Sequence, residues 1–379
     1  MPPPQKPPIG PPPRARLIVM LTLFTVTTLA FALLFTAATT GWTATGAIPA
    51  PLSPATTRAH TKPCPDDTAT AELTIHAPES PFPLRNHAPH LGTDGEDIAA
   101  LFRRLTRATP LSLISTTPLQ ADTQEPEGMV VTADGSHLII SSTPKDPEAT
   151  GPAMLLFSLP AGALLATLSL TSPSPSSPDQ PEPHNGGLDS NATHVFLALS
   201  GSRPETTATI YSLSLADFAL RPLLHFPSDH VGTLVAPPAT NRNRGPGRIA
   251  GMNWGSRTSY SFPLMDRCTT QSSGDNVARV DNPSHFVDYQ DCKLLTETSA
   301  LCSGVSNLGE GEYRLGGLAL VDVATMRPVH EVPVTLQSEQ GTRMTMNPFD
   351  VAVVDGKLTF YWAPDQHNTS LYTYQADIA

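Results

Sequence analysis

The chain has 379 residues, of which 41 are proline and 25 glycine, and only 15% are charged. So many turn-forming residues and so few charges argue against a protein rich in long helices and favour an all-β domain. The net charge of -11 argues against nucleic acid as a partner, because an acidic surface repels phosphate groups.

The N-terminal region predicts a membrane anchor. Residues 1–16 are rich in proline and indicate a disordered tail, whereas residues 17–40 contain no charged side chain. As a helix, this apolar run is long enough to cross about 30 Å of hydrocarbon. Arg14 and Arg16 precede it, so the positive-inside rule places the tail in the cytosol and the rest of the chain outside the cell or in a lumen. The alternative is a secreted protein, released by cleavage of a signal peptide before Ala47.

The next two segments differ in pattern. Residues 41–92 are rich in proline, threonine and alanine and predict an extended stalk. Thr93 and Glu96 then have the spacing of a capping box, and apolar residues follow at helical intervals from Ile98 to Leu105. A short amphipathic helix is therefore expected at the start of the folded domain.

Five short β-type runs recur after residue 110, at intervals of about 45 to 65 residues. Each is followed by further strand-like runs, a pattern that predicts four-stranded units and hence a β-propeller of about five blades over residues 93–379. Six blades are the alternative if residues 265–281 contain more strand. The last unit lacks a fourth strand, which residues 111–119 are expected to supply, closing the ring. The runs are EGMVV from Glu127, GGLDS from Gly186, VGTLV from Val231, HFVDY from His285 and PFDVAVV from Pro348.

The four cysteines predict two disulfides, because their spacings do not match those of zinc sites. Cys292 and Cys302 flank the run KLLTETSAL symmetrically, so a hairpin would place the two sulfur atoms on facing strands. Pairing of Cys64 with Cys268 then follows by elimination. Asn191 and Asn368 begin N-glycosylation sequons, which agree with a lumenal or extracellular location.

Several runs of the sequence resemble an uncharacterised family, the domain-of-unknown-function family 6454. They occur in consistent order through most of residues 98–379. The resemblance implies a propeller-like fold and no activity. The runs are LFRRLTRAT from Leu101, EPEGMVV from Glu125, HNGGLD from His184, DHVGTLV from Asp229, GMNWGSR from Gly251, NPSHFVDYQDC from Asn282 and ALCSGV from Ala300.

The residues at the start of each first strand are the candidate site, because in a propeller these strands line the axis and bring together distant parts of the chain. Imidazole and carboxylate groups around an axis could bind a metal ion, bind a ligand, or simply hydrogen-bond neighbouring backbone. The candidate ligand-binding residues are Glu127, His184, His230, His285 and Asn347.

No common catalytic motif is present, since the chain lacks GxSxG, HExxH, a P-loop and GxGxxG after a strand. We therefore expect a monomeric binding module for an unknown small molecule, glycan or protein. The alternative is a hydrolase or lyase centred on the channel, with or without a metal. The sequence names no cofactor. Trp254 is one of several aromatic residues that could contribute to a small-molecule site.

Overall fold

A computed structural model describes residues 62–64, 70–84, 93–145, 151–171, 182–236, 247–272, 276–284, 286–308 and 313–378. Contacts divide the chain into two units, 1–57 and 58–379, and every described residue belongs to the second. The predicted tail (1–16) and membrane anchor (17–40) lie outside the described residues. Within the described part of the chain, no helix combines the length and apolar composition that a membrane span requires.

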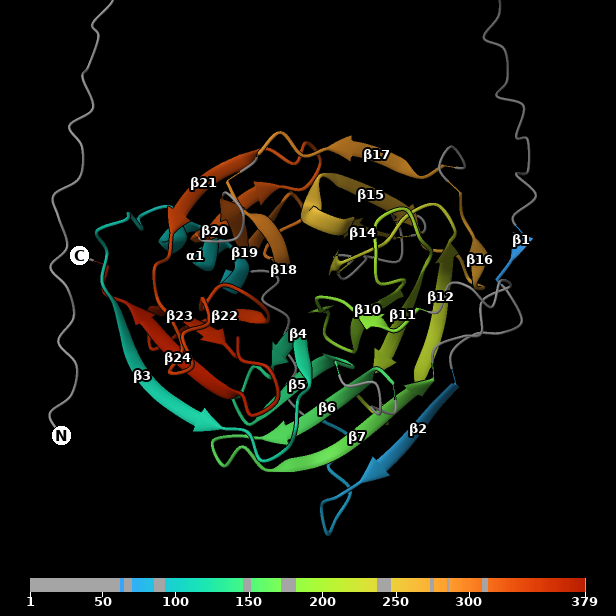
Figure 1. The fold of residues 1–379 in the computed structure, drawn as a ribbon, viewed down its shortest axis with the longest axis horizontal. Helices are drawn as coiled ribbons and strands as arrows, with labels where there is room; N and C mark the ends of the chain where they lie inside the picture. Colours follow the sequence, from blue (N-terminus) through green and yellow to red (C-terminus); the bar gives the residue numbers. More distant parts are fainter. Residues whose placement is uncertain are drawn as a thin grey trace, which may run out of the picture. The chain divides into compact units, whose positions relative to one another are not determined.

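The described strands form five sheets around a common centre, a propeller-like, all-β arrangement (Figure 1). Each sheet is named here by its innermost strand. The β4 sheet contains β4 (Glu125–Val131), β5 (His137–Thr143), β6 (Ala153–Ser158), β7 (Leu164–Thr171) and β2 (Thr70–Ile75). The β8 sheet contains β8 (His184–Asn185), β9 (Asp189–Ser190), β10 (His194–Ser200), β11 (Ala208–Ser214), β12 (Leu220–Phe226), β16 (Thr269–Thr270) and β1 (Lys62–Pro63).

The other three sheets have four strands each. The β13 sheet contains β13 (Thr233–Val235), β14 (Arg248–Met252), β15 (Thr258–Pro263) and β17 (Ala278–Asp281). The β18 sheet contains β18 (Asp288–Leu294), β19 (Ser299–Leu308), β20 (Tyr313–Asp322) and β21 (Pro328–Pro333). The β22 sheet contains β22 (Phe349–Val354), β23 (Lys357–Trp362), β24 (Ser370–Ala376) and β3 (Leu111–Pro118).

This strand count differs from the predicted set of five equal four-stranded blades, because two of the sheets have five and seven strands. The extra strands are β1 and β2 from the N-terminal segment, β16, and one that arises because the inner strand of the β8 sheet is divided into β8 and β9, which both pair with β10. Residues 265–281 do not form a sixth sheet, since β16 pairs with β12 and β17 pairs with β15. The predicted closure is confirmed: β3 pairs antiparallel with β24 and so joins the two ends of the folded domain.

The hydrophobic core is divided among the spaces between neighbouring sheets. Alternating side chains of each sheet face the sheet on either side, so five clusters of buried apolar residues fill the described ring. In the cluster between the β18 and β22 sheets, Leu320 packs with Phe349 and Trp362. Successive side chains of a strand point to opposite faces of the sheet, so inner strands that are buried along their whole length have two buried faces.

Serine side chains link neighbouring sheets near one end of the axis. Ser141 donates to the carbonyl oxygen of Gly186 at 2.8 Å, and Ser200 donates to that of Val231 at 2.8 Å. Ser256 accepts from the backbone N–H of Tyr289 at 2.8 Å, and Ser303 donates to Thr345 at 3.2 Å. Each bond satisfies a backbone group where one sheet ends and the next begins.

The segment expected to be a stalk is partly structured. Residues 62–64 and 70–84 lie within the predicted stalk (41–92), yet β1 pairs with β16 and β2 pairs with β7 along the perimeter of the ring (Figure 1). The Cys64–Cys268 disulfide fixes β1 beside β16. Sequence periodicity did not reveal β2 because all six of its residues are exposed, so burial imposes no apolar alternation.

Both predicted disulfides are confirmed. Cys292 and Cys302 are direct partners in the register of β18 and β19, with 4.1 Å between their Cα atoms. Cys64 and Cys268 have Cα atoms 5.4 Å apart. All four cysteines are thus oxidised, which agrees with a domain that folds in an oxidising compartment.

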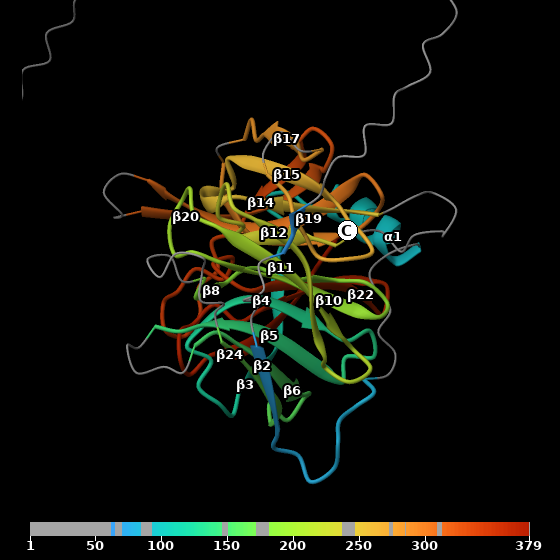
Figure 2. The ribbon, with the colours of Figure 1, turned by 90° about the vertical axis from the view of Figure 1, so that its right-hand side faces the viewer.

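The predicted helix is confirmed as α1 (Thr93–Phe102). Ile98 and Phe102 on α1 and Leu105 just after it are buried against the β18 and β22 sheets. His330 also contacts this segment, and its Nε2 lies 2.7 Å from the carbonyl oxygen of Leu105. In side view, α1 lies on one side of the ring and β8 on the opposite side (Figure 2). The helix therefore covers one end of the ring and leaves the β8 end to other residues.

Candidate functional site

The inner strands of neighbouring sheets lie in close contact around the centre of the ring. A Cβ atom added to Gly128 would lie 2.2 Å from the backbone nitrogen of Leu188, and one added to Gly186 would lie 2.2 Å from the carbonyl oxygen of Gly232. Only glycine allows the inner strands to approach so closely.

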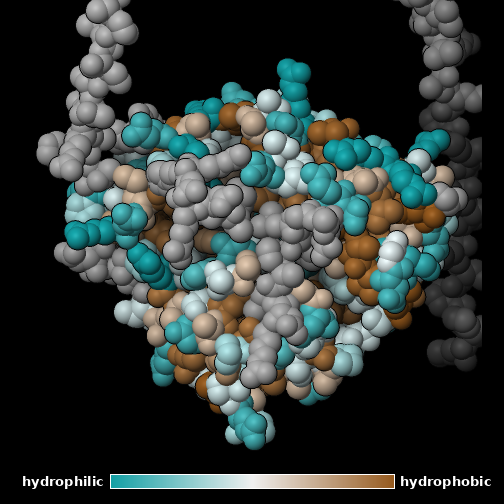
Figure 3. Space-filling view, turned by 180° about the vertical axis from the view of Figure 1, so that it is seen from behind, coloured by the Kyte–Doolittle hydropathy of each residue, from teal (hydrophilic) through white to brown (hydrophobic). Residues whose placement is uncertain are grey.

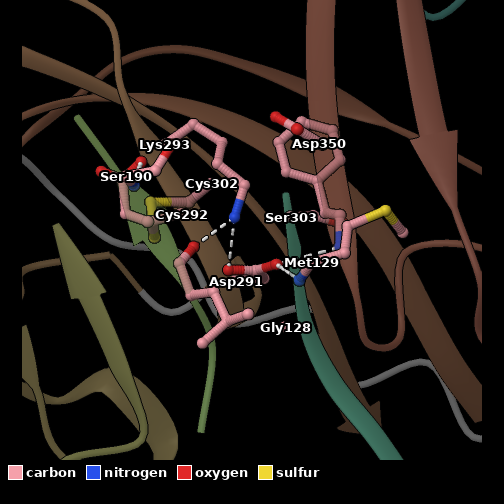
Figure 4. A network of polar contacts seen from close by, with 12 residues as sticks. Gly128, Met129, Ser190, Asp291, Cys292, Lys293, Cys302, Ser303 and Asp350 are labelled. Atoms are coloured by element: carbon pink, nitrogen blue, oxygen red, sulfur yellow. Dashed lines mark hydrogen bonds and ion pairs between the residues drawn. A yellow bond between two sulfur atoms is a disulfide. The ribbon is translucent and has the colours of Figure 1, made fainter. Parts of the chain in front are cut away.

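Asp291 and Lys293 form a buried ion pair at the centre, called here the axial network (Figure 4). Lys293 Nζ lies 2.8 Å from Asp291 Oδ1 and also donates to the carbonyl oxygen of Leu188. The other carboxylate oxygen accepts from the backbone N–H groups of Met129 (3.1 Å) and Phe349 (3.0 Å). One side chain of β18 therefore joins three inner strands.

Two more aspartates on inner strands make similar links. Asp189 Oδ2 accepts from the backbone N–H groups of Ala236 (2.8 Å) and Leu294 (2.9 Å), and Asp350 Oδ2 accepts from that of Val131 (2.6 Å). Burial raises the pKa of Asp189 to about 6, against the lowering effect of Lys293 and these donors. The recurrent aspartate in the runs GGLDS, YQDCK and PFDVA was the sequence signal for these contacts, and it was missed.

Glu127 begins a second polar group at the β8 end of the axis. It is the extra residue of a β-bulge in β4, since Pro126 and Gly128 pair with consecutive residues of β5. Bulges redirect side chains and often occur beside functional sites. Asn347 Nδ2 donates to Glu127 Oε2 at 2.5 Å, and His184 Nε2 lies 3.4 Å from Glu127 Oε1.

His184 and His230 extend this group toward the surface. Their ring centroids are 4.8 Å apart, and the indole of Trp254 lies edge-on to His230 at 4.9 Å. His230 is fixed by a 2.6 Å hydrogen bond from Nδ1 to the carbonyl oxygen of Gly201. The four residues Glu127, His184, His230 and Asn347 are called here the mouth cluster.

Burial shifts the pKa of each titratable member of the mouth cluster toward the uncharged form. It raises the pKa of Glu127 well above its usual value, and the negative charge of nearby Glu125 adds to the rise. Burial also lowers the pKa of His184 to about 4 and that of His230 to about 3. Burial therefore disfavours the charged forms of both Glu127 and His184 at their contact.

A cavity of about 330 Å³ adjoins the mouth cluster, and three sheets contribute its walls. Glu125 forms an ion pair with Lys145 and accepts from Gln366 Nε2 at 2.9 Å. The lining residues share a mainly polar character: Glu125, Pro126, Arg314, Gln340, Thr342, Met346, Asn347, Pro364 and Gln366. Glycan, polyol or other hydroxylated ligands suit walls of this kind.

Two buried polar atoms of the mouth cluster have no hydrogen-bond partner among the described residues, Asn347 Oδ1 and His184 Nδ1. Asn347 is only 8% exposed and also lines the cavity. Buried polar atoms are normally satisfied, so an unpaired acceptor on a cavity wall is a place where a ligand or water would bind.

Four of the five predicted site residues are thus brought together, namely Glu127, His184, His230 and Asn347. His285 lies outside the described residues. In the described part of the chain, no three histidine, cysteine or carboxylate side chains are arranged to hold a metal ion. Sequence reasoning missed the cavity residues Arg314, Gln340 and Gln366, because they lie in turns and strand ends that follow no repeat.

A second cavity, of about 550 Å³, lies between the β13 and β18 sheets. Val235, Ala250, Val280 and Leu294 give it mainly apolar walls, and it does not include any member of the mouth cluster. Polar chemistry therefore favours the smaller cavity as the candidate site.

The two predicted sequons lie on the surface of the ring. Asn368 is exposed, and Gln340 Nε2 lies 3.3 Å from its carbonyl oxygen, so this sequon adjoins the smaller cavity. Asn191 is half-buried in a turn, where its Oδ1 accepts from the backbone N–H groups of Thr193 and His194.

Hydropathy on the face opposite to that of Figure 1 is mixed, and apolar residues gather mainly near the right-hand edge of Figure 3.

Comparison with solved structures finds chains of low similarity. An α-L-arabinanase of Penicillium chrysogenum, solved with arabinobiose, has a TM-score of 0.41 and 10% identity, covering 71% of this chain and 100% of its own. A GH43_1 enzyme of Xanthomonas citri has a TM-score of 0.39 and 10% identity, covering 75% and 93%. Similarity at this level carries no inference about activity.

No curated protein matches the sequence. A family model does match residues 94–379, and the chain belongs to that family of unknown function, DUF6454.

Proposed function

We propose that the protein binds a small, hydroxylated ligand in the cavity beside the mouth cluster. The observation that carries the proposal is Asn347, a residue of the cavity wall whose Nδ2 donates to Glu127 and whose buried Oδ1 has no partner among the described residues. A ligand hydroxyl would satisfy this acceptor. Gln340, Thr342 and Gln366 add amide and hydroxyl groups that can exchange hydrogen bonds with further hydroxyls.

The fixed position of these groups supports binding with little reorganisation. Asn347 is held by Glu127, and Gln366 is held by Glu125, which is itself paired with Lys145. Side chains that are already ordered lose less conformational entropy when a ligand binds. The cavity is also close to the lower end of the usual size range for small-molecule sites.

Titration calorimetry of the full-length protein with a panel of neutral monosaccharides, disaccharides and polyols tests the proposal. We expect at least one member of the panel to bind. Asn347→Ala and Gln366→Ala should each weaken the binding of that ligand about 3- to 10-fold, which corresponds to the loss of one hydrogen bond of about 1 kcal/mol. Ala324→Ser, at the apolar cavity, is the matched control. Absence of binding across the panel, or binding unchanged by both variants, would show the proposal to be wrong.

A catalytic function of the same site is the second candidate. Burial and the charge of Glu125 raise the pKa of Glu127 and so favour its protonated form, and a proton donor of this kind is what general acid catalysis requires. Hydrolysis of chromogenic glycosides and esters tests it. Glu127→Gln should abolish turnover while leaving binding of the neutral sugar within about 3-fold, since glutamine keeps the shape and a neutral charge.

We also propose that the domain is held at the membrane by residues 17–40, with the ring on the lumenal or extracellular side. The two disulfides support the compartment. Glycosylation at Asn368 and Asn191 is part of the same proposal. Carbonate extraction of membranes tests the anchor, because a cleaved and secreted form would appear in the soluble fraction. Glycosidase treatment of the full-length protein tests the glycosylation.

A further inference from the structure

One cationic side chain lines the cavity, and none of the described residues forms an ion pair with it. This residue is Arg314, and among the described residues its Nη1 contacts the sulfur atom of Met346 at 3.2 Å. No ion pair within the described residues involves Arg314. A guanidinium group presents a rigid fork of donors that matches a carboxylate, so this wall is suited to an anionic group.

The acidic residues of the same wall do not cancel this charge. Glu125 is paired with Lys145, and Glu127 is held between Asn347 and His184. Burial and the charge of Glu125 raise the pKa of Glu127, which favours its uncharged form. Among the described residues of the wall, Arg314 is then the charge that a ligand would meet without a counterion.

We propose that the ligand carries one carboxylate as well as hydroxyl groups, with the carboxylate on Arg314 and a hydroxyl on Asn347 Oδ1. A sugar acid has this chemistry. The inference rests on the proposed function and specifies the class of ligand for the same site. It predicts that an acidic sugar binds more tightly than the neutral sugar of the same ring.

Binding of the acidic ligand should also depend on the charge of Glu127. Four charged or titratable groups surround Glu127. They are Glu125 of β4, Lys145 just after β5, His184 of β8 and His230 in the segment that precedes β13. The pKa of His184 is lowered to about 4 and that of His230 to about 3, so both imidazoles stay uncharged at neutral and alkaline pH. As the pH rises through the raised pKa of Glu127, a second negative charge appears near the ligand, and affinity for the acid falls.

Calorimetry of the full-length protein with glucuronate and glucose tests the proposal, because the two share the same ring and differ only at C6, where glucuronate has a carboxylate and glucose a hydroxymethyl group. We expect glucuronate to bind at least 10-fold more tightly at pH 6. Arg314→Ala should remove that preference while leaving glucose binding within about 2-fold, and Arg314→Lys should restore part of it. Arg327→Ala, an exposed arginine outside the cavity, is the matched control.

The Glu127→Gln variant tests whether the pH dependence comes from the carboxyl group of Glu127. In the wild type, the preference for glucuronate should decline as the pH is raised from 6 to 9, whereas in Glu127→Gln it should stay constant. Equal affinity for both sugars, with both weakened by Asn347→Ala, would overturn this inference and leave the proposed function intact. Failure of both sugars and of the neutral panel would overturn both. An equal pH dependence in wild type and Glu127→Gln would refute the role of Glu127.

Discussion

The axial network and the mouth cluster differ in how completely their polar atoms are satisfied. Both place buried, titratable side chains on or next to inner strands. In the axial network, Asp291 and Lys293 have partners for their charged atoms, drawn from three strands. In the mouth cluster, Asn347 Oδ1 and His184 Nδ1 lack partners among the described residues. Complete satisfaction indicates a structural role, whereas unpaired atoms beside a cavity indicate a binding role.

Removal of Asp291 should have the largest effect. Asp291→Ala leaves the ammonium group of Lys293 buried without its carboxylate, and we expect a loss of about 3 to 5 kcal/mol in the free energy of unfolding. Urea denaturation followed by circular dichroism measures it. The double variant Asp291→Ala/Lys293→Met removes both charges and should recover part of the loss. A single variant as stable as the wild type would contradict the structural role of the pair.

Gly128→Ala tests the close contact between the inner strands of the β4 and β8 sheets. The added Cβ would lie 2.2 Å from the backbone of Leu188, and we expect a loss of about 1 to 3 kcal/mol. Gly232→Ala is the matched control, because there the first obstacle is the His230 ring at 3.2 Å. The control should be the milder change in thermal unfolding and should affect ligand binding more than stability. The reverse order of stabilities would show that the inner strands are not in close contact at Gly128.

The mouth cluster should affect stability mainly through pH. The pKa of His184 is about 4 in the folded protein and near 6.5 when unfolded, so the unfolded chain binds more protons between these values. Stability therefore falls as the pH is lowered from 6.5 to 4. In His184→Gln this decline should be smaller by about 1 to 3 kcal/mol, measured by urea denaturation at pH 4.5 and pH 7. Parallel profiles for both proteins would argue against a buried neutral histidine.

Asn347→Ala should have the smallest effect on stability. It removes one hydrogen bond to Glu127, and it also removes a buried acceptor that has no described partner. We expect a change of no more than about 1 kcal/mol in the free energy of unfolding, together with clear loss of ligand affinity. Thermal unfolding and calorimetry on the same sample compare the two. A large destabilisation without any change in affinity would assign Asn347 to the structural group.

The repeat of strand-like runs predicted much of the fold. Inner strands were recognised because their residues are apolar on both faces, as in β4, where all residues after Glu125 are buried. Helix α1 and the pairing of β3 with β24 followed from local periodicity and from the missing last strand. The strands β1 and β2 were not predicted, because exposed perimeter strands carry little apolar pattern.

The candidate site was predicted in part. Glu127, His184, His230 and Asn347 were found because each stands at or just before an inner strand. Simple alternation of side chains does not hold throughout NPSHFVDYQDC, because the register of β18 shifts between Tyr289 and Asp291. A single extra residue changes which face later side chains occupy, so Asp291 reaches the centre of the ring. Such a bulge depends on partner strands and has no local signal.

By itself, the sequence determined the all-β class, the pairing of Cys292 with Cys302 and the set of residues that begin the inner strands. These depend on periodicity and spacing, which are local. Only the tertiary structure decided which polar atoms find partners, where the cavity lies, and that Arg314 faces it beside Asn347. The physical reason is that burial and hydrogen bonding here join residues more than 200 positions apart, as between Asn347 and Glu127.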